Sequence, residues 1–157
     1  MRAAQLVLRR IGAVLAGMLS NIALSIATDV ALQAAGVYPP LSEPNLFTTP
    51  LWLLATAYRT VYGVAGSYLT ARLAPDHPMG HALVLGALGL AASTAGAVVM
   101  RGVGPAWYPL ALVALAMPCA WAGGRLHGMS LRALREITSP AATRQLEARR
   151  QAPRPTP

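Results

Sequence analysis

Apolar residues run along this chain in four long stretches, which segments rich in polar residues, Pro or Gly separate. The stretches cover about residues 11–36, 51–73, 79–100 and 107–126. Each approaches or exceeds the roughly 20 residues that an α-helix needs to cross the hydrocarbon core of a bilayer. None alternates apolar and polar residues as the strands of a membrane β-barrel do. The pattern predicts an all-α, polytopic membrane protein with four transmembrane helices in an antiparallel up-down bundle.

The separating segments contain the residues that end helices. Residues 37–50 include four prolines, and the shorter segments read Ala74-Pro-Asp-His-Pro78 and Arg101-Gly-Val-Gly-Pro-Ala106. Proline has no backbone N–H, and its ring clashes with the preceding turn of a helix. We therefore expect three loops, of which the first is the longest.

A signal peptide is the alternative interpretation of the first apolar stretch, because Arg9 and Arg10 precede it. The apolar region of a signal peptide has only about 7–15 residues, and this stretch is longer. It also contains Asn21 and Asp29, which suit a helix that packs in a bundle. We therefore expect a retained transmembrane helix.

The arginines lie almost entirely on one side of the four expected spans. The chain has 13 basic and 5 acidic residues, and every basic residue is Arg. Only Arg101 falls on the other side, and only Arg59 falls within a span. Because cytoplasmic segments carry the excess of positive charge, we expect a multi-pass protein of the cell (inner or plasma) membrane with cytoplasmic N- and C-termini. Trp52, Trp107 and Tyr108 then lie at the outer interface, which aromatic rings favour.

The composition excludes an ordinary soluble domain. The chain is 55% hydrophobic and 11% charged, whereas a soluble domain carries about 25% charged residues. The net charge of +8 is strongly basic, and basic chains often bind nucleic acid. Here the arginines flank apolar stretches, so the lipid bilayer is the expected partner. The Arg-rich tail is expected to meet anionic lipid headgroups rather than nucleic acid.

The composition changes near residue 128. Residues 1–128 form the predicted transmembrane domain, and residues 129–157 form a cytoplasmic tail. Residues 130–137 place apolar side chains near one helical face and arginines on another, which predicts a short cytoplasmic amphipathic helix at the membrane surface. Residues 151–157 are polar and Pro-rich, a composition typical of disorder.

Two ionisable residues lie inside the expected spans, where each is costly without a partner. Asp29 lies about seven residues before the end of the first helix, and Arg59 about seven residues past Trp52. At 1.5 Å per residue, both lie roughly 10 Å below the outer membrane surface. Because the first two helices are consecutive and antiparallel, we expect an intramembrane ion pair. The pair either fixes helix register or belongs to a ligand, ion or proton site.

Small and polar residues recur at every fourth position along the first helix: Ala13, Gly17, Asn21, Ser25, Asp29 and Gln33. Such a ridge has to face protein or water rather than lipid. The second helix offers matching residues, and the candidate polar interface residues are Asn21, Ser25, Gly63 and Ser67. Close helix packing is one interpretation. A hydrated pathway between the two helices is the other.

Pro118 lies inside the fourth apolar stretch. Because it removes one backbone hydrogen bond, we expect a helix kink near Ala114, one turn earlier. Such kinks occur in transporters and are also ordinary in membrane helices.

No catalytic or cofactor motif occurs along the sequence. The loop acids Glu43 and Asp76 form no carboxylate pair, and there is no phosphate-binding loop, dinucleotide fingerprint, zinc-protease motif or nucleophile elbow. The histidines, His77, His81 and His127, lack metal-ligand spacing and suit the cytoplasmic interface. We therefore expect no enzymatic activity, no cofactor and no metal.

Three segments of the chain resemble known proteins: Ala57–Pro75, Pro78–Gly86 and Gly104–Leu112. They are similar to a family of small, uncharacterised bacterial four-helix integral membrane proteins. The resemblance covers about residues 10–127 and implies the four-helix topology, without an activity. Arg59 lies within the first of these segments.

These observations leave three functions open. The leading hypothesis is a non-enzymatic membrane protein whose helices pack with a second copy (a homo-oligomer) or with a membrane-protein partner. The alternative is a small transporter or channel subunit that uses the polar region between the first two helices. A membrane-embedded enzyme ranks last. A cavity that reaches Asp29 or Arg59 would favour transport, whereas a dry core with an exposed small-residue face would favour assembly.

Overall fold

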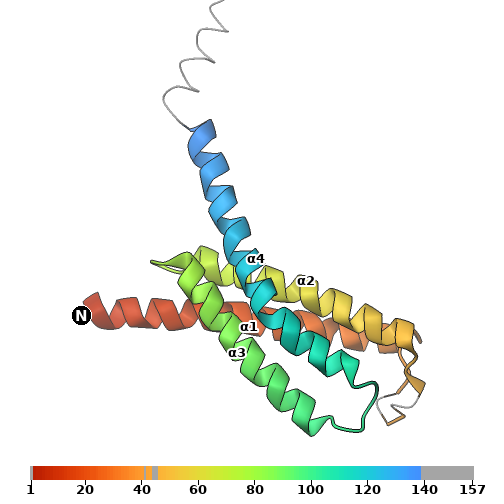
Figure 1. The fold of residues 1–157 in the computed structure, drawn as a ribbon. Coiled ribbons are helices and arrows are strands. Elements are labelled where there is room, and N and C mark those ends of the chain that lie inside the picture. Colours follow the sequence, from red (N-terminus) through yellow and green to blue (C-terminus); the bar gives the residue numbers. More distant parts are fainter. Residues whose placement is uncertain (1, 41, 44–45, 139–157) are drawn as a thin grey trace, which may run out of the picture.

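The computed structural model describes residues 2–40, 42–43 and 46–138, and most of this part of the chain is helical (Figure 1). The helices are α1 (Arg2–Ala34), α2 (Thr49–Leu73), α3 (Pro78–Val99) and α4 (Trp107–Ile137). No strand occurs in the described ranges. The predicted all-α class is therefore confirmed.

Three of the four described helices, α1, α3 and α4, are long and apolar enough to cross a membrane. The sequence predicts four such helices, and by length and composition three of the described helices meet this criterion. α2 has sufficient length at 25 residues, but two arginines and three tyrosines make it more polar than the others. This composition suits its position, because α2 contacts each of the other three helices. Neighbouring protein can therefore supply partners for polar side chains of α2.

Two helices extend beyond their expected ends. α1 begins at Arg2 rather than near residue 11, because residues 2–10 contain neither Pro nor Gly to interrupt it. α4 continues without a break to Ile137, so the expected separate amphipathic helix is the last part of α4. The remainder of the expected tail, residues 139–157, lies outside the described residues.

Successive helices run in opposite directions, so α2 and α4 run the same way (Figure 1). α1 contacts α2 and α3, α4 also contacts α2 and α3, and no contact joins α1 to α4 within the described residues. The order around the bundle is therefore α1, α2, α4, α3. The sequence prediction specifies helices of alternating direction and no order around the bundle.

Glycines at the helix crossings account for this order. A Cβ atom on Gly123 of α4 would lie 2.5 Å from the carbonyl oxygen of Val64 in α2. A Cβ atom on Gly66 of α2 would lie 2.7 Å from the carbonyl oxygen of Gly17 in α1. Only glycine permits such approach, and small residues let helix backbones come together in membranes.

α4 changes direction in its middle, and its last part projects away from the other helices (Figure 1). Pro118 lies inside α4, where it cannot donate a backbone hydrogen bond to the preceding turn. Apolar side chains on the projecting part are exposed: Leu126, Met129, Leu134 and Ile137. The apolar face of the expected amphipathic segment is thus uncovered in the monomer.

The bundle has two distinguishable ends. The α1–α2 and α3–α4 connections lie at one end, which we name the long-loop end. α1 begins at the opposite end, where residues 74–77 connect α2 to α3. We name this the short-loop end.

Candidate functional site

Asp29 of α1 and Arg59 of α2 form an ion pair in the half of the bundle nearer the long-loop end. Arg59 Nη2 donates to Asp29 Oδ2 at 2.7 Å. The side chains are 28% exposed for Arg59 and 30% exposed for Asp29. The structure therefore brings together the two intramembrane charges of the sequence prediction, and it leaves both within reach of a small molecule.

Two tyrosine hydroxyls extend this pair. Tyr58 donates from its hydroxyl to Asp29 Oδ1. Arg59 Nη1 donates to the hydroxyl of Tyr108, at the start of α4. Hydrogen bonds to charged groups are about twice as strong as those between neutral groups, so these contacts tie α1, α2 and α4 together. We name Asp29, Tyr58, Arg59 and Tyr108 the polar cluster.

The sequence prediction missed both tyrosines. Tyr58 immediately precedes Arg59 in α2, so its place beside the expected ion pair was an available signal. The sequence pattern instead predicts Tyr108 at the membrane interface. No feature of the sequence pairs Tyr108 with Arg59, because that distance depends on how α4 packs on α2.

A series of aromatic rings packs behind Tyr108 at the long-loop end. Ring centres are 5.2 Å apart for Tyr38 and Phe47, 5.1 Å for Phe47 and Trp52, and 4.6 Å for Trp52 and Tyr108. Tyr38, Trp52 and Tyr108 are buried, together with Ala55. The sequence predicts Trp52 at the membrane interface. In the structure its ring is instead part of the protein core.

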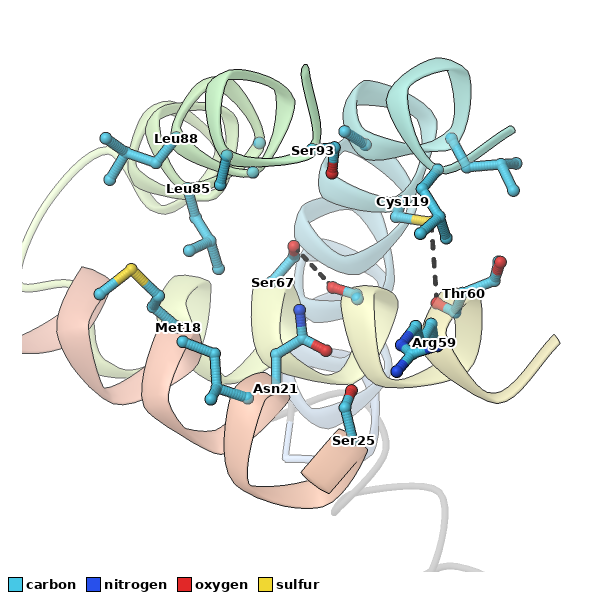
Figure 2. Close-up of a pocket in the computed structure, with 18 of the residues that line it drawn as sticks. Met18, Asn21, Ser25, Arg59, Thr60, Ser67, Leu85, Leu88, Ser93 and Cys119 are labelled. Carbon is cyan, nitrogen blue, oxygen red and sulfur yellow. Dashed lines mark hydrogen bonds between the residues drawn. The ribbon is translucent and has the colours of Figure 1, made fainter. Parts of the chain in front are cut away.

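A cavity of about 370 Å³ lies beside the polar cluster, with lining residues from all four helices (Figure 2). Asn21 and Ser25 of α1 and Arg59 of α2 line one side. Leu85 and Leu88 of α3 line the opposite side. We name it the inner cavity, because it lies on the short-loop side of the ion pair.

A second cavity, of about 680 Å³, lies on the long-loop side, and we name it the outer cavity. Its lining includes rings of the aromatic series, together with Gln33 and Gly96. The two cavities share four lining residues: Asp29, Arg59, Ser93 and Leu112. The ion pair therefore lies at the boundary between the cavities.

All four candidate interface residues line the inner cavity: Asn21, Ser25, Gly63 and Ser67. Ser67 is buried and donates to the carbonyl oxygen of Gly63 at 2.8 Å. Asn21 Oδ1 is buried without a hydrogen-bond partner among the described residues. α1 and α2 approach closely at Gly17 and Gly66. The candidate residues line the inner cavity and also lie beside close helix contacts, because Asn21 neighbours Gly66 and Ser67 neighbours Gly123 of α4.

A second ion pair lies at the short-loop end. Arg10 of α1 donates from Nε to Asp76 Oδ1 at 3.0 Å, and its Nη2 also donates to Asp76 Oδ2. Such bidentate pairing fixes geometry as well as charge. The hydrogen bonds from Arg10 lower the pKa of the Asp76 carboxyl below its ordinary value. The sequence pattern indicates a role for Arg10 in membrane orientation and predicts no partner for Asp76, so this contact is a finding of the structure.

His127 is buried rather than interfacial. Its ring packs edge-on against Tyr68 of α2, with 5.7 Å between ring centres. Its Nδ1 atom has no hydrogen-bond partner in the described structure. Burial follows from the close packing of α4 on α2 near Gly123, which the sequence pattern did not reveal.

No family model, curated protein or solved structure matches the chain. The chemistry of the site therefore follows from its own geometry. The polar cluster offers one anion, one cation and two hydroxyls at the boundary of two cavities. This arrangement can bind a small polar molecule, and it can separate the two spaces.

Proposed function

We propose that the chain is a non-enzymatic integral protein of the cell membrane that acts as a small-solute transporter or transporter subunit. One observation carries this proposal: the outer and inner cavities meet at Asp29 and Arg59. A transporter alternates access to a central site from either side of the membrane. A salt bridge at the boundary of two cavities is suited to block the passage of a solute from one cavity to the other.

In this proposal all four helices cross the membrane, including α2. Arg59 of α2 is paired with Asp29, and Arg72 lies in the last turn of α2, where a cation can reach the interface. The arginine distribution supports cytoplasmic termini and a cytoplasmic short-loop end. The outer cavity then opens toward the outside of the cell.

The projecting part of α4 would lie on the cytoplasmic leaflet. Arg125, Arg132 and Arg135 are exposed there, and they attract anionic lipid headgroups. The exposed apolar side chains of the same segment would enter the boundary between headgroups and acyl chains.

Efflux from proteoliposomes tests transport without knowledge of the solute. Liposomes with the purified protein are loaded with amino acids, sugars, and small organic cations and anions, and mass spectrometry follows the loss of each. We expect at least one class to leave faster than from protein-free liposomes. Asp29→Asn should change that rate, whereas Thr94→Ala, on an exposed part of α3, should not. Equal retention of every class with and without protein would reject transport.

Assembly of several copies through α3 is a second candidate, and one observation favours it. Ala87, Ala91 and Ala95 are exposed at every fourth position of α3 and line neither cavity, so this face leaves room for a helix of another chain. Small residues promote such contacts in membranes. Crosslinking through Ala91→Cys in native membranes tests this candidate. A dimer band supports it, and a band at monomer size alone contradicts it.

A further inference from the structure

We infer that the polar cluster binds a small zwitterion that carries an apolar group, such as a free amino acid with an aliphatic or aromatic side chain. This inference rests on the proposed function, for which it names the class of solute. It follows from three properties of the site, which are its net charge, its unused hydrogen-bonding capacity and the lining of the adjacent cavities.

The site presents both signs of charge at once. Arg59 Nη2 lies 2.7 Å from Asp29 Oδ2, so a ligand that reaches one of these groups also lies close to the other. A ligand with only a positive charge would be attracted by Asp29 and repelled by Arg59. A ligand with only a negative charge would be attracted by Arg59 and repelled by Asp29. In surroundings of low dielectric constant these opposing terms are large. A zwitterion can present its ammonium group to Asp29 and its carboxylate to Arg59.

Both ions keep hydrogen-bonding capacity for a ligand. A guanidinium carries five N–H donors and a carboxylate accepts about four hydrogen bonds. Among the described contacts, Arg59 donates to Asp29 and to Tyr108. Asp29 accepts from Arg59 and from Tyr58. A ligand can therefore bind both ions without displacing their present partners, and the partial exposure of both side chains gives it access.

The cavities supply apolar surface next to these charges. Phe47, Trp52 and Met100 line the outer cavity, and Leu85 and Leu88 line the inner one. Small-molecule sites commonly combine an apolar lining with a few polar groups that fix orientation. An apolar side chain on the zwitterion therefore has a place on either side of the ion pair, whereas a purely polar zwitterion would leave these walls without contact.

Calorimetric titration of the full-length protein in detergent tests the inference through matched ligands. Leucine carries both charges, leucinamide keeps only the ammonium charge, and N-acetyl-leucine keeps only the carboxylate. Glycine keeps both charges without the apolar group. We expect leucine or phenylalanine to bind at least tenfold more tightly than the two singly charged derivatives and more tightly than glycine. Equal binding of a singly charged derivative, or no binding of either amino acid to the folded protein, overturns the inference.

A variant that blocks the site without removing a charge guards against loss of folding. Ser93 lines both cavities, so Ser93→Leu should fill their junction and lower the affinity for leucine at least tenfold. Thr94→Leu, on the exposed part of the same helix, should bind leucine as the wild type does. Unchanged affinity of Ser93→Leu would place the ligand elsewhere and overturn the inference.

The ligand class and the transport proposal can fail separately. Efflux of a different solute class from the loaded liposomes, together with an absence of amino-acid binding, rejects the zwitterion and leaves transport in place. Amino-acid binding without efflux of any solute rejects transport and leaves the binding site in place.

Discussion

Asp29 and Arg59 hold opposite charges among helices that are largely apolar. Charge in such surroundings is tolerated when it is paired and hydrogen-bonded. Arg59 supplies the pairing, and Tyr58 and Tyr108 supply the further hydrogen bonds. Because both charged side chains are partly exposed, the pair is less costly to disturb than one sealed in a core.

Asp29→Asn should lower the free energy of unfolding by about 1–3 kcal/mol, because Arg59 loses its anion. A fully buried pair would cost about 3–5 kcal/mol, and partial exposure reduces this penalty. Titration of the protein with SDS in mild detergent measures the effect. The exchange variant Asp29→Arg/Arg59→Asp restores the pair and should recover most of the loss. An exchange variant no more stable than Asp29→Asn would show that the pair does not hold α1 to α2.

Asp76 makes stability depend on pH at the short-loop end. Its pKa in the folded protein lies below the ordinary value of 3.8, so folding favours the carboxylate. The resulting stabilisation is complete above the unfolded pKa and is lost as the pH falls from about 3.8 through the folded pKa. Between about pH 5 and pH 3, the Tm of the wild type should fall further than that of Asp76→Asn. If the Tm of the two proteins falls equally with pH, the Arg10–Asp76 contact does not stabilise the fold.

The helices meet where glycine allows their backbones to approach. A Cβ atom on Gly123 would lie 2.5 Å from the Val64 carbonyl oxygen and 2.7 Å from Ser67 Cβ. α3 is packed on α4 near Gly86, where a Cβ atom would lie 2.5 Å from Ala120 Cβ. Toward the long-loop end, at Gly89 and Gly96, no atom lies within 4 Å of an added Cβ atom. The looser packing of this part of α3 leaves room for the cavities.

Gly123→Ala should therefore separate α4 from α2 and lower the free energy of unfolding by about 1–3 kcal/mol, the usual cost of overpacking. Gly89→Ala is the matched control, because nothing lies within 4 Å of its added Cβ atom. This control should be neutral or stabilise the protein by up to about 1 kcal/mol, since alanine favours the helix. Thermal unfolding in detergent compares the two variants. An equal loss in both would mean that helix contact at Gly123 does not explain the effect.

Much of the molecule could be predicted because local patterns determine it. Apolar runs separated by Pro and Gly located the helices, and the matched depths of Asp29 and Arg59 indicated their contact. The order of helices around the bundle could not be predicted, because it depends on close approach at Gly123 of α4. The contact of Tyr108 with Arg59 follows from that same packing. The cavities depend on where α3 leaves its neighbours, which no run of apolar residues encodes.

The whole molecule combines an ion pair at the short-loop end with two cavities, one on each side of a second ion pair. Arg10 of α1 binds Asp76 in the connection between α2 and α3. Asp29 and Arg59 line both the outer cavity and the inner cavity. We propose that the Asp29–Arg59 pair is the barrier between these two cavities. A barrier of this kind should determine which cavity residues are accessible to water from outside the cell.

Labelling with a membrane-impermeant thiol reagent from outside the cell measures this control directly. In a Cys119→Ala background, Gly96→Cys places a thiol in the outer cavity and Ser25→Cys places one in the inner cavity. We predict that Gly96→Cys reacts rapidly and that Ser25→Cys reacts slowly until Asp29→Asn breaks the ion pair. Equally rapid labelling of both thiols with the pair intact, or no labelling of Gly96→Cys, would contradict the proposed barrier.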